Sequence, residues 1–82
     1  MNGFIVVGIN SNGDNLYISN TSPILWTSER KECKLFTNFR SAKTDLEDHF
    51  IYLSATIVHT DIKNIFIAEY INDIEVGRKR FL

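Results

Sequence analysis

The chain has 82 residues, of which 44% are hydrophobic and 23% charged, and its formal net charge is -1 at pH 7. A chain of this length forms one domain with a single core and is too small to enclose a deep cleft between two layers. The charged fraction argues against disorder, and basic and acidic stretches alternate instead of pooling. We therefore expect a single domain, residues 1–82, that folds without a metal or a cofactor.

The first third of the chain predicts three strands, at Phe4–Ile9, Leu16–Ser19 and Ile24–Trp26. The first of them is apolar on both alternating faces, which is typical of a central strand. Asn12-Gly13 tolerates positive φ and predicts a hairpin turn within Ser11–Asn15. Asn20–Pro23 predicts a polar loop before the third strand.

The middle of the chain predicts two helices joined by an extended link. Thr27 or Ser28 caps a short helix of two turns, with Glu29 in the first turn, where the helix dipole favours an anion. Leu35–Thr37 is the extended link. A longer helix, from about Asn38 to Tyr52, follows from an apolar stripe at steps of three and four residues. The stripe consists of Phe39, Ala42, Leu46, Phe50 and Leu53.

The last third predicts three strands, at Ala55–Thr60, Ile65–Ile71 and Ile74–Phe81, with turns at Asp61–Asn64 and Asn72-Asp73. Five isoleucines between positions 57 and 71 favour strands, because Cβ branching packs well on a pleated surface. A helix over residues 62–71 remains the open alternative. Together the elements predict an α+β fold: a small antiparallel sheet of about five strands packed on one amphipathic helix, with an additional short helix.

Two histidines and one cysteine are the candidate reactive groups. His49 follows Asp45 by four residues on the predicted helix, so the two form either a surface ion pair, which we favour, or a general-base dyad. His59 is expected as a hydrogen-bonded histidine within an apolar strand and not as a metal ligand. Cys33 is expected as a small buried apolar residue, although the neighbouring Lys31 and Lys34 could activate a thiol.

Cysteine usage and the N-terminal segment predict where the protein works. Cys33 is the sole cysteine, so neither a disulfide framework nor a zinc knuckle can be built. Gly3–Ile9 is apolar but too short to span a bilayer, and it has no signal-peptide pattern. Asn10–Asn15 has a single carboxylate and predicts a hairpin turn in preference to a calcium loop. We expect a cytoplasmic protein without catalytic, cofactor or metal residues.

Two regions are candidate contact surfaces. The first lies in the charge-poor N-terminal third, where an exposed patch of Tyr17, Ile24, Leu25 and Trp26 would resemble the centre of a protein interface. For Trp26 we favour the alternative, in which it fills the core between the hairpin and the short helix. The second region is the C-terminal GRKRFL, where Arg78, Lys79 and Arg80 form either a weak nucleic-acid contact or a solubilised edge strand, which we favour.

The segment from Trp26 to Leu46 resembles a pattern in short uncharacterised proteins of phages and Gram-positive bacteria. That pattern, W-T-x-[DE]-x-x-x-A-x-x-F-x-[ST]-x-x-x-A-x-x-x-L after a β-hairpin, covers about half the chain. Cys33 stands at its small Ala and Asn38 at its capping Ser or Thr. The resemblance implies no activity, catalytic residue or ligand, but it does suggest a phage or mobile-element context and a host cytoplasm.

The functional expectation is a non-enzymatic protein-binding module. In the context that the resemblance implies, it would be an accessory protein that inhibits or redirects a host macromolecule, such as a defence protein. We expect a protein partner, no membrane, and a monomer or small homo-oligomer. The alternative is a nucleic-acid-associated accessory protein that uses the C-terminal basic strand.

Overall fold

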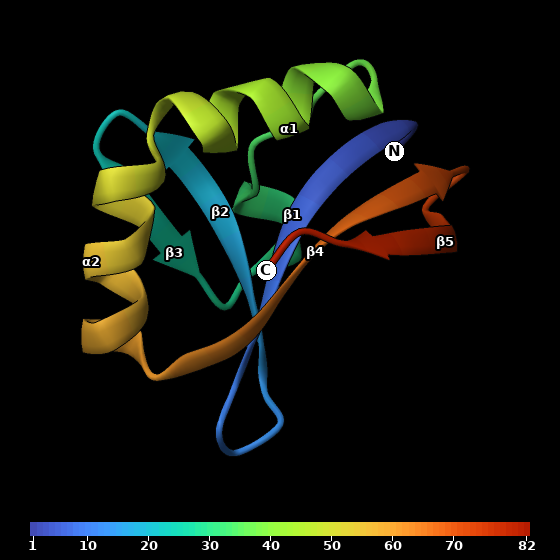
Figure 1. The fold of residues 1–82 in the computed structure, drawn as a ribbon. Coiled ribbons are helices and arrows are strands. Elements are labelled where there is room, and N and C mark those ends of the chain that lie inside the picture. Colours follow the sequence, from blue (N-terminus) through green and yellow to red (C-terminus); the bar gives the residue numbers. More distant parts are fainter.

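Five antiparallel strands form one sheet in the order β3-β2-β1-β4-β5, and two helices lie against it (Figure 1). A computed structural model describes all residues, 1–82. The α+β fold predicted from the sequence is confirmed. In chain order the elements are β1 (Gly3–Asn10), β2 (Asn15–Thr21), β3 (Ile24–Thr27), the 3-10 turn η1 (Arg30–Glu32), α1 (Phe39–Asp48), α2 (Phe50–Thr60), β4 (Ile62–Ile71) and β5 (Ile74–Arg80).

β1 is the central strand, as its sequence predicts. Val6 points to the helix-covered face of the sheet, whereas Ile5 and Val7 point to the other face, and all three are almost fully buried. β1 pairs with β2 on one side and with β4 on the other. An apolar residue at every position is required of a strand that is covered on both faces.

Both predicted hairpin turns are confirmed. Between β1 and β2, the Asn10 side chain accepts hydrogen bonds from the backbone N–H groups of Asn12 and Asp14, at 3.0 and 2.9 Å. Between β4 and β5, Asn72 and Asp73 both have positive φ, at 53° and 66°. Two consecutive positive φ values are the requirement of a two-residue type I′ turn, and Asn and Asp tolerate them best among the residues that carry a side chain.

The predicted two-turn helix after β3 is shorter than expected. Only the single turn η1 forms, although the Thr27 hydroxyl accepts from the backbone N–H of Glu29 at 3.1 Å, as a capping residue does. The turn ends because the backbone N–H of Lys34 donates to the carbonyl of Ile18 at 2.8 Å, which draws the chain back to the sheet. Phe36 then pairs with Phe4 through two backbone bonds, so the predicted extended link at Leu35–Thr37 is confirmed.

The predicted helix over Asn38–Tyr52 is correct at its start and wrong at its end. Asn38 caps it, because its side chain accepts from the backbone N–H of Ser41 at 2.8 Å. α1 ends at Asp48, and the chain changes direction at His49 before α2 begins. The predicted apolar stripe is therefore broken. Ala42, Leu46 and Leu53 are buried, whereas Phe50 is 43% exposed.

Ala55–Thr60 is helical and not a strand, and this is the largest correction to the sequence-based prediction. α2 continues to Thr60, and Asp61 ends it in the left-handed conformation at φ 57°. β4 then begins directly at Ile62, so the predicted turn at Asp61–Asn64 is reduced to one residue, and residues 62–71 are a strand. Ile57, four residues after Leu53, packs against the same main core, which is the spacing of two residues on the inner side of one helix.

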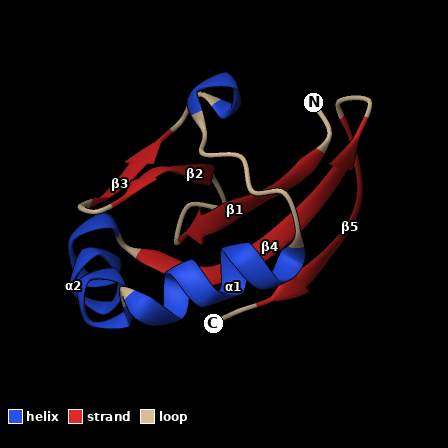
Figure 2. Ribbon diagram, turned by 90° about the horizontal axis from the view of Figure 1, so that it is seen from above, coloured by secondary structure: helices blue, strands red, loops and turns tan.

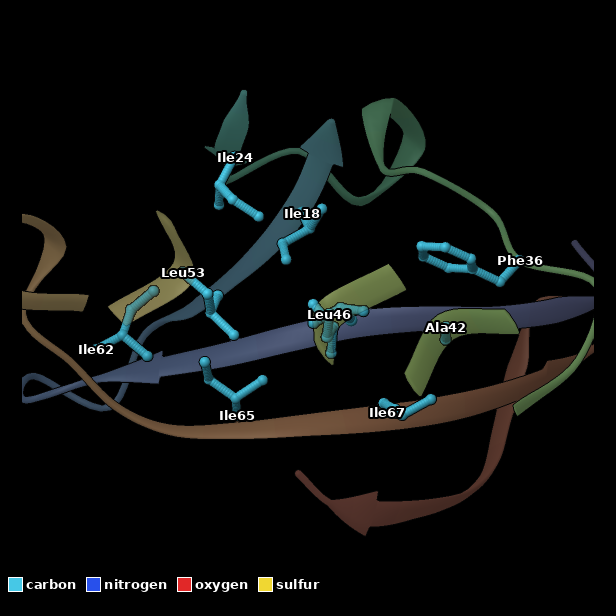
Figure 3. Packing of buried hydrophobic residues seen from close by; sticks show 10 residues of the cluster. Ile18, Ile24, Phe36, Ala42, Leu46, Leu53, Ile62, Ile65 and Ile67 are labelled. Carbon is cyan, nitrogen blue, oxygen red and sulfur yellow. The ribbon is translucent and has the colours of Figure 1, made fainter. Parts of the chain in front are cut away.

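The main core lies between the sheet and the two helices. Figure 3 shows Leu46 of α1 and Leu53 of α2 pointing toward Ile18, Ile65 and other side chains of the sheet. The opposite face of the sheet carries a smaller cluster of Ile5, Val7, Ala68 and Tyr70, against which Met1, Tyr17 and Cys33 pack. Figure 2 shows α1 and α2 together on one side of the sheet and the η1 turn away from them.

Candidate functional site

α2 is the element whose surface departs most from that of an ordinary helix. None of its 11 residues is a Lys, Arg, Asp or Glu. On its inner side, Leu53 is buried in the main core and Ile57 packs against that core. Thr56 accepts a hydrogen bond from the indole Nε1 of Trp26 at 3.3 Å and donates to the carbonyl of Leu53 at 2.8 Å. These contacts fix which side of α2 faces away from the protein.

The outward side of α2 is apolar. Ile51 and Val58 are each 81% exposed and Tyr52 is 66% exposed, while Ala55 is exposed between them. Positions 51, 55 and 58 lie on one stripe of a helix, because they are separated by four and then three residues. We call the surface formed by Ile51, Tyr52, Ala55 and Val58 the α2 outer face.

The size of the α2 outer face places it among functional patches. Large apolar side chains present roughly 150–250 Å² each when free, so the exposed fractions of Ile51, Tyr52 and Val58 correspond to on the order of 400 Å². The largest apolar patch on a monomeric protein is typically of this size and is often a binding site. A helix that serves only to cover a sheet carries polar residues on its outward side instead.

The surroundings of the α2 outer face have the pattern of an interface rim. Glu47 and Asp48 are exposed just before α2, and His59 is exposed in its last turn. A surface hollow of about 300 Å³ borders the patch and is lined by Thr21, Ser22, Pro23, His49 and Tyr52. An apolar centre with polar residues around it is the usual arrangement of a protein–protein contact. The expectation that His59 lies within an apolar strand is wrong, because it lies on the surface of a helix.

The four residues predicted to form an interface are not brought together. Ile24 is buried in the main core, and Trp26 packs against that core, with its ring close to Gly8 of β1. Tyr17 packs against the cluster on the opposite face of the sheet, and Leu25 is exposed. Trp26 therefore fills part of the core, but it lies beside α2 and not between the hairpin and the short helix. Its role toward the α2 outer face is positional, since its indole holds Thr56 on the inner side of the helix.

Asp45 and His49 belong to a polar cluster that joins three parts of the chain. One Asp45 oxygen accepts from the Lys34 ammonium at 2.9 Å and from the Thr21 hydroxyl at 2.8 Å. His49 Nδ1 lies 3.1 Å from the other Asp45 oxygen and 2.8 Å from the Asp45 carbonyl. Both neighbours of Nδ1 are acceptors, so Nδ1 carries a proton.

The order of groups in this cluster is not that of a nucleophile and its base. A catalytic triad places the imidazole between the hydroxyl and the carboxylate, whereas here Asp45 lies between Thr21 and His49. Burial raises the pKa of Asp45, but the hydrogen bonds from Lys34 and Thr21 and the positive charge of Lys34 outweigh burial and hold the pKa below its usual value. Asp45 therefore stays ionised and serves as an acceptor that ties β2 to α1.

The basic residues of β5 are divided between the two faces of the sheet. The ammonium of Lys79 lies over the ring of Phe39 at 5.1 Å, whereas the guanidinium groups of Arg78 and Arg80 lie over Phe66 at 5.2 and 5.7 Å. Arg78 also forms an ion pair with Glu75 at 2.7 Å. On the same face as Arg78 and Arg80, Arg30 of η1 lies over Tyr70 at 4.9 Å, which the sequence did not predict.

Cys33 is half-buried and packs against the cluster on the helix-free face. Burial raises the pKa of its thiol above the usual value, which disfavours the reactive thiolate. No three His, Cys, Asp or Glu side chains gather in a group that could hold a metal ion. Neither helix has the length and hydropathy needed to cross a membrane.

Comparison with known proteins adds no functional information. Protein-family models gave no match, and neither the search of curated proteins nor that of solved structures returned one. The resemblance of Trp26–Leu46 to a phage and Gram-positive pattern therefore stays a prediction. The α2 outer face remains the candidate site on physical grounds alone.

Proposed function

We propose that this protein is a small non-enzymatic protein-binding module and that its contact surface is the α2 outer face. The observation that carries the proposal is the 81% exposure of both Ile51 and Val58 on a helix without a charged residue. This surface takes the place of Tyr17, Ile24, Leu25 and Trp26, the possible interface considered from the sequence.

The energetic argument is that nothing in the fold requires these residues to be apolar. Leu53 and Ile57 already supply the inner side of α2, so the residues at 51, 52 and 58 contribute little to the core. Covering the α2 outer face with a partner would remove on the order of 400 Å² of apolar surface from water, which contributes roughly 10 kcal/mol before the entropic cost of association is subtracted. Binding is the function that uses this surface.

An enzymatic role for Asp45 and His49 is the competing hypothesis from another functional class. The contacts of the carboxylate favour the structural role, because Lys34, Thr21 and His49 together occupy both of its oxygens. The narrower function, a phage accessory protein acting on a host macromolecule, stays a prediction.

Site-specific photocrosslinking in living bacterial cells tests the proposal. A benzophenone amino acid replaces Val58 in one variant and Lys43, an exposed residue of α1, in the control. We expect a discrete protein adduct from position 58 and none from position 43, because only the first probe lies in the α2 outer face. No adduct at position 58, or the same adducts at both positions, would contradict the proposal.

A nucleic-acid-associated function is the second candidate, and one observation favours it. The fold brings Arg30 to the same sheet face as Arg78 and Arg80, beside the rings of Phe66 and Tyr70. Single-stranded nucleic acids bind to surfaces that combine cations with aromatic rings. The pairing of Arg78 with Glu75 reduces the charge available to phosphates and weakens this candidate.

Fluorescence anisotropy with a single-stranded oligonucleotide tests the second candidate. Salt-sensitive binding that is lost when Arg30, Arg78 and Arg80 are changed to Ala, and kept when Lys79 on the other face is changed, would support it. Absence of binding at low salt would exclude the nucleic-acid-associated function.

A further inference from the structure

We infer that the partner of the α2 outer face is a second copy of this chain, with the two α2 helices packed antiparallel about a two-fold axis near Ala55. This inference rests on the proposed function, since it names the partner for the same surface. Three features of α2 support it: the absence of charge, the spacing of the exposed residues, and the position of the nearby carboxylates.

The absence of charge matters because a two-fold contact places a surface against itself. Any charged residue near the axis would meet the same charge on the other copy. Phe50–Thr60 contains no Lys, Arg, Asp or Glu, so its outward side can be paired with itself without that penalty. A hetero-partner would not impose this restriction, because a charge on one side could be matched on the other.

The spacing of the exposed residues matches that of an antiparallel helix pair. Ala55 lies between Ile51, four residues before it, and Val58, three residues after it. A small residue at the axis lets the helices approach closely. Antiparallel packing centred there brings Ile51 of each copy against Val58 of the other, in the alternating three- and four-residue pattern of helix–helix seams.

The carboxylates at the start of α2 select the antiparallel direction. Glu47 and Asp48 are exposed immediately before the helix. Parallel packing would bring all four carboxylates of two copies together, whereas antiparallel packing keeps the two pairs at opposite ends. The hollow of about 300 Å³ lined in part by Pro23 and Tyr52 lies at the same end of α2, where the C-terminal turn of the other copy would cover it.

The area of the contact predicts a weak dimer. Two copies of the α2 outer face would bury on the order of 800 Å² of apolar surface, and the polar rim brings the total close to about 1,000 Å², the lower limit for a specific interface. Interfaces of this size are typical of weak and transient contacts, so we expect a dissociation constant of about micromolar or weaker. The monomer and the dimer should therefore both be detectable at ordinary protein concentrations.

Sedimentation velocity of the full chain over a hundredfold concentration range tests the inference. The apparent mass should rise from 9.5 kDa toward twice that value as concentration increases. Ile51→Glu alone and Val58→Lys alone should each give a monomer at all concentrations. Lys43→Glu, on the outward side of α1, is the control and should leave the association unchanged. Circular dichroism confirms that each variant is folded.

The double variant Ile51→Glu/Val58→Lys provides a test of the arrangement itself. In the antiparallel pair position 51 of one copy faces position 58 of the other, so the two substitutions place opposite charges together twice. The double variant should recover dimerisation, in a salt-sensitive form. Within one helix the two positions are two turns apart, so the recovery cannot come from a contact inside one copy.

The outcomes separate failure of this inference from failure of the proposed function. A wild-type chain that stays at 9.5 kDa at every concentration overturns the inference, but a crosslinked adduct at position 58 with another protein would leave the proposed function standing. A dimer that neither single variant dissociates, or that the double variant does not restore, also overturns the inference. Absence of every adduct at position 58 overturns both.

Discussion

α1 and α2 are consecutive helices of nearly equal length that lie on the same face of one sheet, yet they present opposite surfaces to solvent (Figure 2). Leu46 of α1 and Leu53 of α2 are both fully buried, so the inner side of each helix buries a leucine side chain in the main core. Outward, α1 exposes Arg40, Lys43, Glu47 and Asp48, whereas α2 exposes Ile51, Tyr52 and Val58. Packing on the sheet therefore constrains only the inner side of each helix. The outer side carries polar residues where it faces water, as in α1, or apolar residues where a partner can cover it, as in α2.

The two helices also differ in how they are held. α1 begins with the Asn38 cap and carries Asp45 with its polar cluster in its last turn, so directional bonds hold both ends of the helix. α2 has no side-chain cap at its start and is joined to the sheet by apolar packing and the bond from Trp26 to Thr56. Substitutions in α1, in α2 and at the contact between β1 and Trp26 should therefore differ in their effect on stability.

Truncating a buried side chain of α1 should destabilise the protein far more than truncating an exposed side chain of α2. Leu46→Ala should lower the free energy of unfolding by roughly 2–5 kcal/mol, because the side chain is fully buried in the main core. Ile51→Ala should change it by less than about 0.5 kcal/mol, because the side chain is largely exposed. Urea unfolding below the concentration of dimer formation measures both. Equal losses would show that the α2 outer face contributes to the core.

Gly8→Ala should disturb the contact that positions α2. A Cβ at this position would lie 2.8 Å from the ring of Trp26 and 2.9 Å from Cδ1 of Ile62, so the indole must move. We expect a loss of roughly 1–3 kcal/mol in unfolding free energy and a shift in Trp26 fluorescence, because overpacking forces side chains out of their rotamers. Gly77→Ala, with open space around it, is the matched control. An unchanged fluorescence spectrum in the Gly8 variant would contradict the close packing of Trp26 on β1.

Asp45→Asn should weaken α1 and change the pH dependence of stability. The pKa of Asp45 is lower in the folded protein than its usual value, so the ionised group stabilises the fold above the unfolded pKa. This contribution is lost as the pH falls through the folded pKa. We expect a loss of roughly 1–2 kcal/mol at pH 7, on the scale of charged hydrogen bonds.

The pH dependence gives the control for that variant. Wild type and Asp45→Asn should converge in unfolding free energy as the pH falls below 3.8, the ordinary pKa of Asp, and through the lower pKa of the folded protein, because protonation removes the same charge. Thermal unfolding at a series of pH values measures the difference. A gap that stays constant down to pH 2 would mean that the charge of Asp45 contributes nothing.

Asn38→Ala should have the smallest of these effects. It removes the acceptor for the Ser41 N–H at the start of α1, and loss of an N-cap lowers stability by about 1 kcal/mol. Asn38→Ser keeps a capping oxygen and should restore most of the loss. The same midpoint for all three proteins in urea would exclude a capping role.

The strands were predictable because local chemistry and tertiary structure agree there. Gly13, Asn72 and Asp73 supply the positive φ values that the two hairpin turns adopt, and every position from Ile5 to Val7 is apolar where both faces are buried. α1 was predictable for the same reason, from the Asn38 cap and the spacing of Ala42 and Leu46. In each case the residues favour only the conformation that the fold adopts.

The sequence does not predict α2, because its residues are compatible with a strand as well as with a helix. Ile57 and Val58 favour strands when considered locally, and an apolar residue can be buried in a strand as readily as exposed on a helix. No Gly or Pro at His49 marks the end of α1. The signal that was available was the run without charge from Phe50 to Thr60, with apolar residues at 51, 55 and 58. The charge-poor N-terminal third gave the opposite result, because there the missing charges reflect burial on both faces.

β1 joins two partners that lie at very different distances along the chain. β2 follows it through a short turn, and a hairpin of this kind forms in roughly 1–10 μs. Gly3 of β1, however, lies opposite Tyr70 of β4, so the second ladder must bring together residues from near the two ends of the chain. Sheets dominated by such distant pairings fold in milliseconds to seconds. Until that ladder closes, the inner side of α2 lacks the β4 side chains of the main core, so apolar residues on both of its sides are exposed to chaperones and to neighbouring nascent chains.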